Sequence, residues 1–110
     1  MAPAVWYYVR DLDGARQFYR ETLGFEETGV DFTARWSLLK HGAMEIGLAE
    51  GEPRDDSGVA HVDVPDLKEK ADLLRAAGVN VGIVFELQGE MRLLDVYDPD
   101  GNRVQLAQEL

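Results

Sequence analysis

The chain contains no cysteine among its 110 residues. This absence excludes disulfide bonds, thiolate metal ligands and cysteine nucleophiles, so nitrogen and oxygen groups must supply any chemistry. No apolar run is long enough to cross a bilayer. The first residues, Met1 to Trp6, lack the basic and apolar regions of a signal peptide. The sequence therefore predicts a cytoplasmic protein with no membrane partner.

Basic residues are scarce, with 11 Lys and Arg against 21 Asp and Glu, and the formal net charge is -10. Nucleic acid is not expected as a partner, because phosphate binding needs a basic face. The acidity is explained either by solubility or by attraction of a cationic small molecule. The sequence also lacks a glycine-rich phosphate loop and a Ser-His-Asp arrangement, so we assign no catalytic residue from motifs.

The sequence does contain an internal repeat. Val9-Arg10-Asp11-Leu12 begins a segment that ends at Leu23-Gly24-Phe25, and Val64-Pro65-Asp66-Leu67 begins one that ends at Ala77-Gly78-Val79. Each copy predicts a strand followed by a helix. Two copies of one unit usually bury a shared face, so we expect the functional site in the cleft between them.

The pattern along the chain predicts the order βαβββ in each copy. We expect one α+β domain, residues 1–110, with modules 1–52 and 58–110 joined by a polar linker. Its small size favours a homodimer. Asp11 or Asp13 is expected to cap the first helix, and Asp66 with Glu69 the second. Strands are predicted at residues 4–10, 25–28, 34–40, 44–49, 59–64, 81–87, 91–97 and 103–107.

The ordered motifs point to a known family. Val9-Arg10-Asp11-Leu12, Phe18-Tyr19, Leu23-Gly24-Phe25 and Asp98-Pro99-Asp100-Gly101-Asn102 together resemble the vicinal oxygen chelate superfamily. This superfamily includes glyoxalase I, extradiol dioxygenases, fosfomycin-resistance enzymes and bleomycin-resistance proteins. The resemblance covers essentially the whole chain. It implies two βαβββ modules whose mixed sheets curl around a cavity, commonly completed in a dimer.

The resemblance also locates the metal-ligand positions of the family, one on the first and one on the last strand of each module. They correspond to Ala4, Glu45, Val59 and Gln105. Ala4 and Val59 cannot bind a metal, and Gln105 stands where active members usually carry Glu. The resemblance therefore implies a protein without a metal or other cofactor, and it does not favour an enzyme. A divalent metal held by Glu45 and His61 is the alternative.

Aromatic residues are predicted to line the inner face of the first module. Because side chains alternate on a strand, Trp6 and Tyr8 share a face with Ala4. By resemblance, Trp36 stands where bleomycin-resistance proteins stack an aromatic side chain on the drug, and Phe32 lies just before it. Ordinary packing explains each residue equally well. The functional interpretation is a rigid wall for a planar ligand.

Polar residues are predicted on the inner face of the second module. His61 is expected to form hydrogen bonds inside the cavity rather than to bind metal. Asp63 and Asp95 either form internal ion pairs, with Arg92 or Arg103, or await a positively charged ligand. The candidate ligand-binding residues are thus Trp6, Tyr8, Phe32, Trp36, Glu45, His61, Asp63, Asp95 and Gln105. Glu45 is interpreted as a cation anchor in preference to a general base, and His41 as a solvated turn residue.

Three functions are compatible with these patterns. The leading hypothesis is a metal-free protein that sequesters a small, aromatic, cationic molecule, similar to bleomycin-resistance proteins. The second is an enzyme. It is either a metal-dependent lyase, isomerase or dioxygenase that uses Glu45 and His61, or a metal-free acid/base enzyme that adds Asp63. The third is a regulatory or structural module whose cavity is filled by Trp6, Tyr8 and Trp36.

Overall fold

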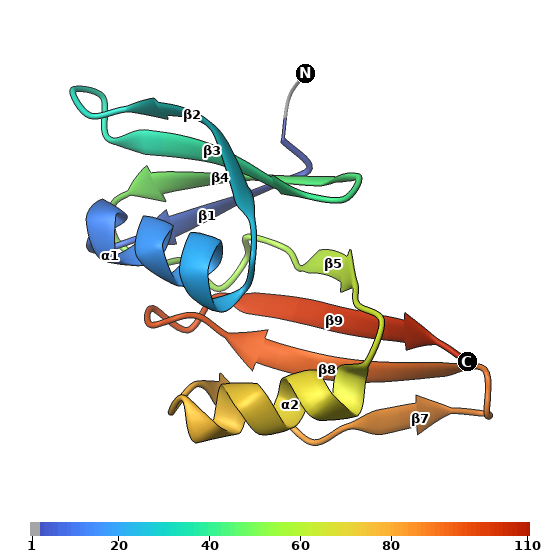
Figure 1. Cartoon of the computed structure of the whole chain (residues 1–110). Helices are drawn as coiled ribbons and strands as arrows, with labels where there is room; N and C mark the ends of the chain where they lie inside the picture. The colour runs from blue at the N-terminus through green and yellow to red at the C-terminus, as the bar shows by residue number, and fades with distance from the viewer. Residues whose placement is uncertain (1–2) are drawn as a thin grey trace.

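The computed structural model describes residues 3–110, which form two sheets, each with one helical segment (Figure 1). The first half contains β1 (Val5–Val9), α1 (Leu12–Gln17), β2 (Glu26–Asp31), β3 (Trp36–His41) and β4 (Met44–Glu50). The second half contains β5 (Ala60–Asp63), α2 (Leu67–Ala76), β6 (Asn80–Val81), β7 (Phe85–Leu87), β8 (Met91–Tyr97) and β9 (Arg103–Glu109). Within this described part of the chain, no helix is long and apolar enough to cross a membrane.

The two sheets repeat one topology. The strand orders are β1-β4-β3-β2 and β5-β9-β8-β6, and β7 also pairs with β8. In each sheet the leading strand is parallel to the last strand, β1 with β4 and β5 with β9. The remaining pairings are antiparallel. The predicted α+β fold of two mixed-sheet βαβββ modules is confirmed.

Both helices begin after an aspartate, but only one aspartate caps its helix. Asp66 accepts a hydrogen bond from the Glu69 amide at 3.1 Å, as predicted, whereas Asp11 makes no side-chain cap. The first helix continues as a π-helical turn, Phe18–Thr22. Gly24 follows with φ +78°, a left-handed conformation that costs glycine little. The helical segment of the first half therefore ends where the sequence predicted.

The strand predicted at residues 81–87 was wrong as a continuous element. Val81 pairs with Val96, and Phe85 pairs with Leu93, so four steps along one strand match three along the other. One extra residue must be accommodated between β6 and β7, and it interrupts the ladder as a bulge does. The alternation of side chains in the sequence gives no sign of this mismatch.

Hydrogen bonds from two buried tyrosines join the halves. The Tyr7 hydroxyl donates to the Arg103 carbonyl and accepts from the Ala60 amide at 2.8 Å. The Tyr19 hydroxyl donates to the Asp98 carboxylate at 2.8 Å. Apolar side chains from both halves form one cluster around these tyrosines. The two sheets therefore share a core.

Side chains on one face of each sheet enter this core, and those on the opposite face do not. On β1, Tyr7 and Val9 are fully buried, whereas Trp6 is 39 % exposed. On β5, Ala60 and Val62 are buried, whereas His61 and Asp63 are exposed. The side chains of both leading strands thus alternate between two faces, as the sequence pattern predicted. Each sheet consequently has one core face and one open face.

Candidate functional site

The open face of the first sheet is aromatic. Strand pairing aligns Trp6 with Gly47, and Gly47 with Leu38 on the next strand. Ala49 is likewise aligned with both Tyr8 and Trp36. Aligned residues on neighbouring strands point to the same side of a sheet. We call this surface, formed by Trp6, Tyr8, Trp36 and Leu38, the aromatic face.

Trp6 lies directly over a glycine. A Cβ atom added to Gly47 would lie 2.3 to 2.6 Å from three atoms of the Trp6 ring, so no other residue fits without moving the indole. The ring thus rests on the backbone of β4, and 39 % of the residue remains exposed. The sequence alone does not reveal this role of Gly47, because it depends on the pairing of β1 with β4.

A cation already stacks on the aromatic face. The guanidinium carbon of Arg54, in the linker between the modules, lies 5.6 Å from the centre of the Tyr8 ring. Two hydrogen bonds to Asp56, at 2.9 and 2.8 Å, hold this guanidinium in place. The ring faces of tyrosine and tryptophan attract flat cations. The aromatic face therefore has the chemistry needed for a planar, positively charged group.

Phe32 lies apart from the other predicted aromatic residues. It occupies the turn between β2 and β3, where the Arg16 guanidinium carbon lies 4.9 Å from its ring centre. Arg16 belongs to α1, whose Leu12 and Ala15 pack into the core. Phe32 is thus on the helix side of the first sheet. Proximity to Trp36 in the sequence placed it with the site, but the reversal of the chain between β2 and β3 separates the two side chains.

The open face of the second sheet is polar. Gln105 of β9 is aligned with His61 of β5 and with Asp95 of β8. His61 Nδ1 lies 3.2 Å from the Gln105 amide oxygen, which accepts the hydrogen bond. His61 Nε2 lies 3.7 Å from an Asp63 oxygen. We call the surface formed by His61, Asp63, Asp95 and Gln105 the polar face.

Asp95 is only partly paired. One carboxylate oxygen lies 3.5 Å from the guanidinium of Arg103, which the sequence suggested as an ion-pair partner together with Arg92. The other oxygen is buried and has no hydrogen-bond partner among residues 3–110. Burial of an unpaired carboxylate oxygen costs free energy. Asp95 thus retains unused capacity to accept a hydrogen bond.

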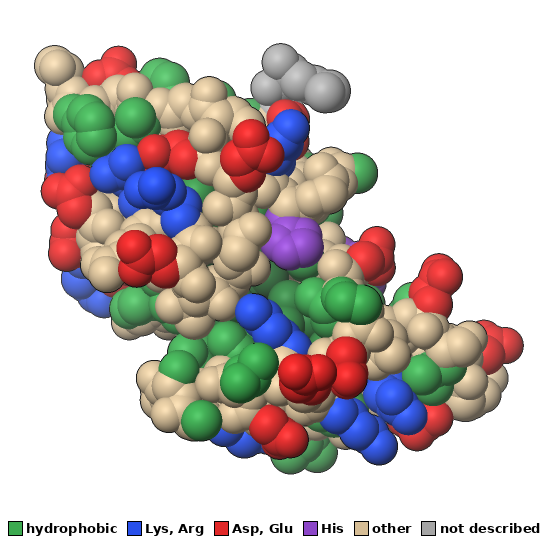
Figure 2. All heavy atoms as spheres, in the orientation of Figure 1, with side chains coloured by type: hydrophobic (Ala, Val, Ile, Leu, Met, Phe, Trp, Pro, Cys, Tyr) green, Lys and Arg blue, Asp and Glu red, His purple; other side chains and the backbone are tan. Residues whose placement is uncertain are grey.

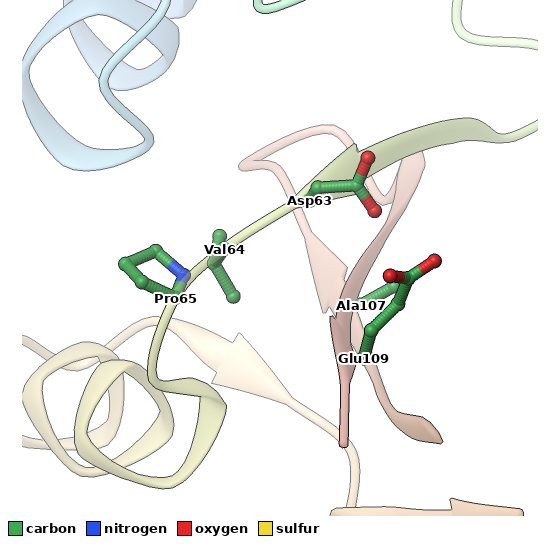
Figure 3. Close-up of a pocket in the computed structure, with 5 residues that line it drawn as sticks. All are labelled: Asp63, Val64, Pro65, Ala107 and Glu109. Atoms are coloured by element: carbon green, nitrogen blue, oxygen red, sulfur yellow. The ribbon is translucent and has the colours of Figure 1, made fainter. Parts of the chain in front are cut away.

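Two hollows border the polar face. One, of about 410 Å³, is lined by Asp63, Val64, Pro65, Ala107 and Glu109 (Figure 3). In Figure 3 the carboxylates of Asp63 and Glu109 extend to the same side of β5 and β9. The other hollow, of about 180 Å³, is lined by His41, Gly42, Ala43, Met44, His61 and Asp63. Asp63 borders both hollows, so this end of the polar face is acidic.

His41 is not the solvated turn residue that the sequence suggested. Its ring packs edge-on against Phe25, with 5.4 Å between ring centres. Burial, followed by the nearby Lys70 charge, lowers the pKa of His41. The prediction was wrong because His41 ends β3, on the side where Leu39 enters the core.

The residues at the metal-ligand positions of the fold do not fit a divalent ion with three strong protein ligands. Ala4 and Val59 carry no donor atom, and the Gln105 amide oxygen already accepts a hydrogen bond from His61. Glu45 lies on the first sheet, aligned with Lys40. Within residues 3–110, no three His, Asp or Glu side chains come together as a metal site. We therefore derive no chemical step through a metal.

The paired modules, each with one core face and one open face, define a glyoxalase-type fold. The model of the Glyoxalase/Bleomycin resistance protein/Dioxygenase superfamily matches residues 3–106, and the chain belongs to this superfamily. A comparison with curated proteins gave no match.

Solved structures share the fold at low identity. An integron cassette protein from the Halifax Harbour sewage outfall metagenome is 24% identical, with a TM-score of 0.81 and 94% of each chain covered. The fosfomycin resistance protein FosX from Listeria monocytogenes is 19% identical, with a TM-score of 0.80, covering 100% of this chain and 93% of its own. A bleomycin resistance determinant encoded on transposon Tn5 is 22% identical, with a TM-score of 0.74, covering 99% and 97%.

Proposed function

We propose that this protein binds a small, flat, cationic aromatic molecule on its aromatic face without a metal, and so sequesters it. The observation that carries the proposal is the Trp6 ring, which lies against the backbone at Gly47 with 39 % of the residue exposed. The stacking of Arg54 on Tyr8 supports the preference for a cation. The net charge of -10 favours the approach of such a ligand. The fold shared with a bleomycin resistance determinant supports sequestration.

Tryptophan fluorescence tests this proposal directly. The chain has two tryptophans, Trp6 and Trp36, and both lie on the aromatic face. Titration with bleomycin and with simpler planar cations is expected to quench their emission. Trp6→Ala and Trp36→Ala should each weaken binding by about 1 kcal/mol, or about fivefold in Kd, because each removes one stacking surface.

Phe32→Ala is the matched control, because Phe32 is an exposed aromatic residue that packs on Arg16, away from the aromatic face. Its affinity for the ligand should equal that of the unsubstituted protein. Equal losses from Phe32→Ala and Trp36→Ala would show that the effect is not local to the aromatic face. If no planar cation quenches the tryptophan fluorescence, the proposal is contradicted.

Closure of the ligand site requires a second copy of the chain under this proposal. The aromatic face is open, and the second sheet exposes further apolar side chains, with Phe85 56% and Leu87 43% exposed on β7. Their aligned partners on β8 are Leu93 and Met91. Large apolar surfaces of this kind usually mark an interface. We propose a homodimer in which these surfaces are covered.

Sedimentation velocity tests the dimer. The expected mass is twice the chain mass of 12.3 kDa. Phe85→Asp should shift the protein to monomer, because a buried unpaired charge is costly at an interface. Leu73→Asp is the control, since Leu73 is 60% exposed on α2 rather than on the second sheet. A monomer at all protein concentrations would contradict the proposal.

The metal-dependent alternative is tested by elemental mass spectrometry. The protein is analysed before and after incubation with nickel, zinc, manganese and ferrous iron. We expect no stoichiometric retention. Retention of about one ion per chain, abolished by Glu45→Gln and His61→Gln, would replace the proposed sequestration with a metalloenzyme function.

A further inference from the structure

A separate pocket lies between the two halves of the chain, on the core side of the first sheet. Its volume is about 330 Å³, which suits a small ligand. Side chains of acidic, basic, histidine and apolar types gather around the hollow between the two halves (Figure 2). The lining residues are Leu23, Gly24, His41, Val64, Pro65, Asp66, Glu69, Lys70 and Leu73. Neither tryptophan of the aromatic face contributes to it.

One pole of this pocket is positive. Lys70 is half-buried, and its ammonium group donates to the Thr22 carbonyl at 3.3 Å. Among residues 3–110, no carboxylate lies within ion-pair distance of Lys70. His41 is close enough for the Lys70 charge to contribute to the lowering of its pKa, so the imidazole is neutral at pH 7. Lys70 and His41 thus offer a charge and a hydrogen-bonding ring to one bound group.

The other pole is negative. Asp66 is the N-cap of α2 and Glu69 lies in its first turn, and both are exposed. Asp66 uses one carboxylate oxygen to cap the helix, and within residues 3–110 Glu69 forms no ion pair. The apolar part of the wall comes from Leu23, Val64, Pro65 and Leu73, and Leu73 is 60% exposed. Both charge signs therefore border one apolar surface.

We propose that this pocket binds a free apolar α-amino acid. Its carboxylate lies toward Lys70 and His41, and its ammonium group lies toward Asp66 and Glu69. Its side chain packs on Leu23, Val64 and Leu73. A simple carboxylic acid is repelled by the two acidic residues, and a simple amine by Lys70. A zwitterion of this size is attracted at both poles.

Isothermal titration with L-leucine and L-phenylalanine, at up to about 10 mM, tests the proposal on the intact protein. N-acetyl-leucine lacks the ammonium group, and leucinamide lacks the carboxylate. Each should bind at least about tenfold more weakly than leucine, because each loses a charged hydrogen bond. No heat of binding for either amino acid, or equal affinity for the blocked compounds, would overturn the proposal.

Substitutions locate the site. Lys70→Met keeps much of the side-chain stem but removes the charge, and it should weaken leucine binding about tenfold. Glu69→Gln should weaken leucine binding but strengthen that of N-acetyl-leucine, because it removes one of the two carboxylates that repel an unpaired carboxylate ligand. Lys68→Met is the control, because Lys68 is exposed on the same helix and does not line the pocket. The Trp36→Ala variant should bind leucine with unchanged affinity, which distinguishes this pocket from the aromatic face.

Discussion

At the scale of single residues, the position of Trp6 depends on the side chain that Gly47 lacks. The indole occupies the space where a Cβ atom at position 47 would lie. Displacement of the indole from the backbone of β4 would change the ring surface that is available for stacking. The chemistry of the aromatic face is thus set by a residue with no functional group.

Gly47→Ala is expected to displace the Trp6 ring, because the added Cβ would lie within 2.6 Å of three ring atoms. In a Trp36→Phe background, Trp6 emission should shift and affinity for a planar cation should fall about fivefold. Gly29→Ala is the matched control, since its Cβ would meet Leu38 and Trp36 only at 3.9 Å. Unchanged Trp6 emission in Gly47→Ala would show that the ring does not need this glycine.

At the scale of elements, the last strand of each module satisfies the helix start of the same module. The Leu12 amide of α1 donates to Glu50 Oε2 at 3.0 Å, and Glu50 ends β4. The Leu67 amide of α2 donates to Gln108 Oε1 at 3.0 Å, and Gln108 lies near the end of β9. The two modules therefore repeat this contact, although the accepting side chain is Glu50 in one module and Gln108 in the other. Asp66 adds a local cap in the second module only.

Asp66→Ala should lower the free energy of unfolding by about 1 kcal/mol, because it removes the hydrogen bond to the Glu69 amide. Asp11→Ala should cost clearly less, because Asp11 stands at the same place in the repeat but makes no cap. Urea denaturation of both variants measures the difference. Equal losses would show that the two aspartates stabilise their helices in the same way.

At the scale of the whole molecule, two ion pairs join separate elements. Glu27 of β2 pairs with Arg16 of α1, and Glu50 of β4 pairs with Arg35 in the turn before β3. Arg16 donates to both oxygens of Glu27, at 2.6 and 2.7 Å, and lowers the pKa of that carboxyl. Arg35 hydrogen-bonds Glu50 and lowers the pKa of Glu50 to about 2. Asp98 differs, because burial raises the pKa of its carboxyl despite hydrogen bonds from Tyr19 and Asn102.

These shifts predict how stability depends on pH. The usual carboxyl pKa of Glu50 is 4.5, and its pKa in the folded protein is about 2, so the unfolded chain binds more protons between these values. The contribution of Glu50, and of Glu27 in the same direction, is present above pH 4.5 and is lost as pH falls. Asp98 acts oppositely, and its contribution is lost as pH rises above 3.8 through its raised pKa.

Urea denaturation between about pH 6 and pH 2 measures this dependence. Stability should fall steeply on the acid side, and Glu50→Gln should make the fall shallower because it removes one titrating carboxylate. Asp98→Asn should instead flatten the dependence above pH 3.8, where Asp98 titrates. A stability that is constant down to pH 2 would contradict the assigned ion pairs.

Local patterns in the sequence predict several elements of this structure correctly. Helix caps and glycine stops predicted the start of α2 at Asp66 and the end of the first helical segment at Gly24. Strand alternation predicted that Trp6 and Tyr8 share one face, and that His61 and Asp63 share another. These predictions succeeded because they depend on neighbours within a few residues of one another. The repeat then fixed the order of the elements.

Contacts between distant residues depend on how the strands pair and how the two halves pack. In the folded chain Gly47 lies beneath Trp6, and Phe32 packs on Arg16. The pairing with β8 is interrupted between Val81 and Phe85. Packing of the two halves also brings Lys70 close to His41. Each of these outcomes depends on strand pairing or on packing between residues far apart in the chain, and one residue of register changes which side chains face each other.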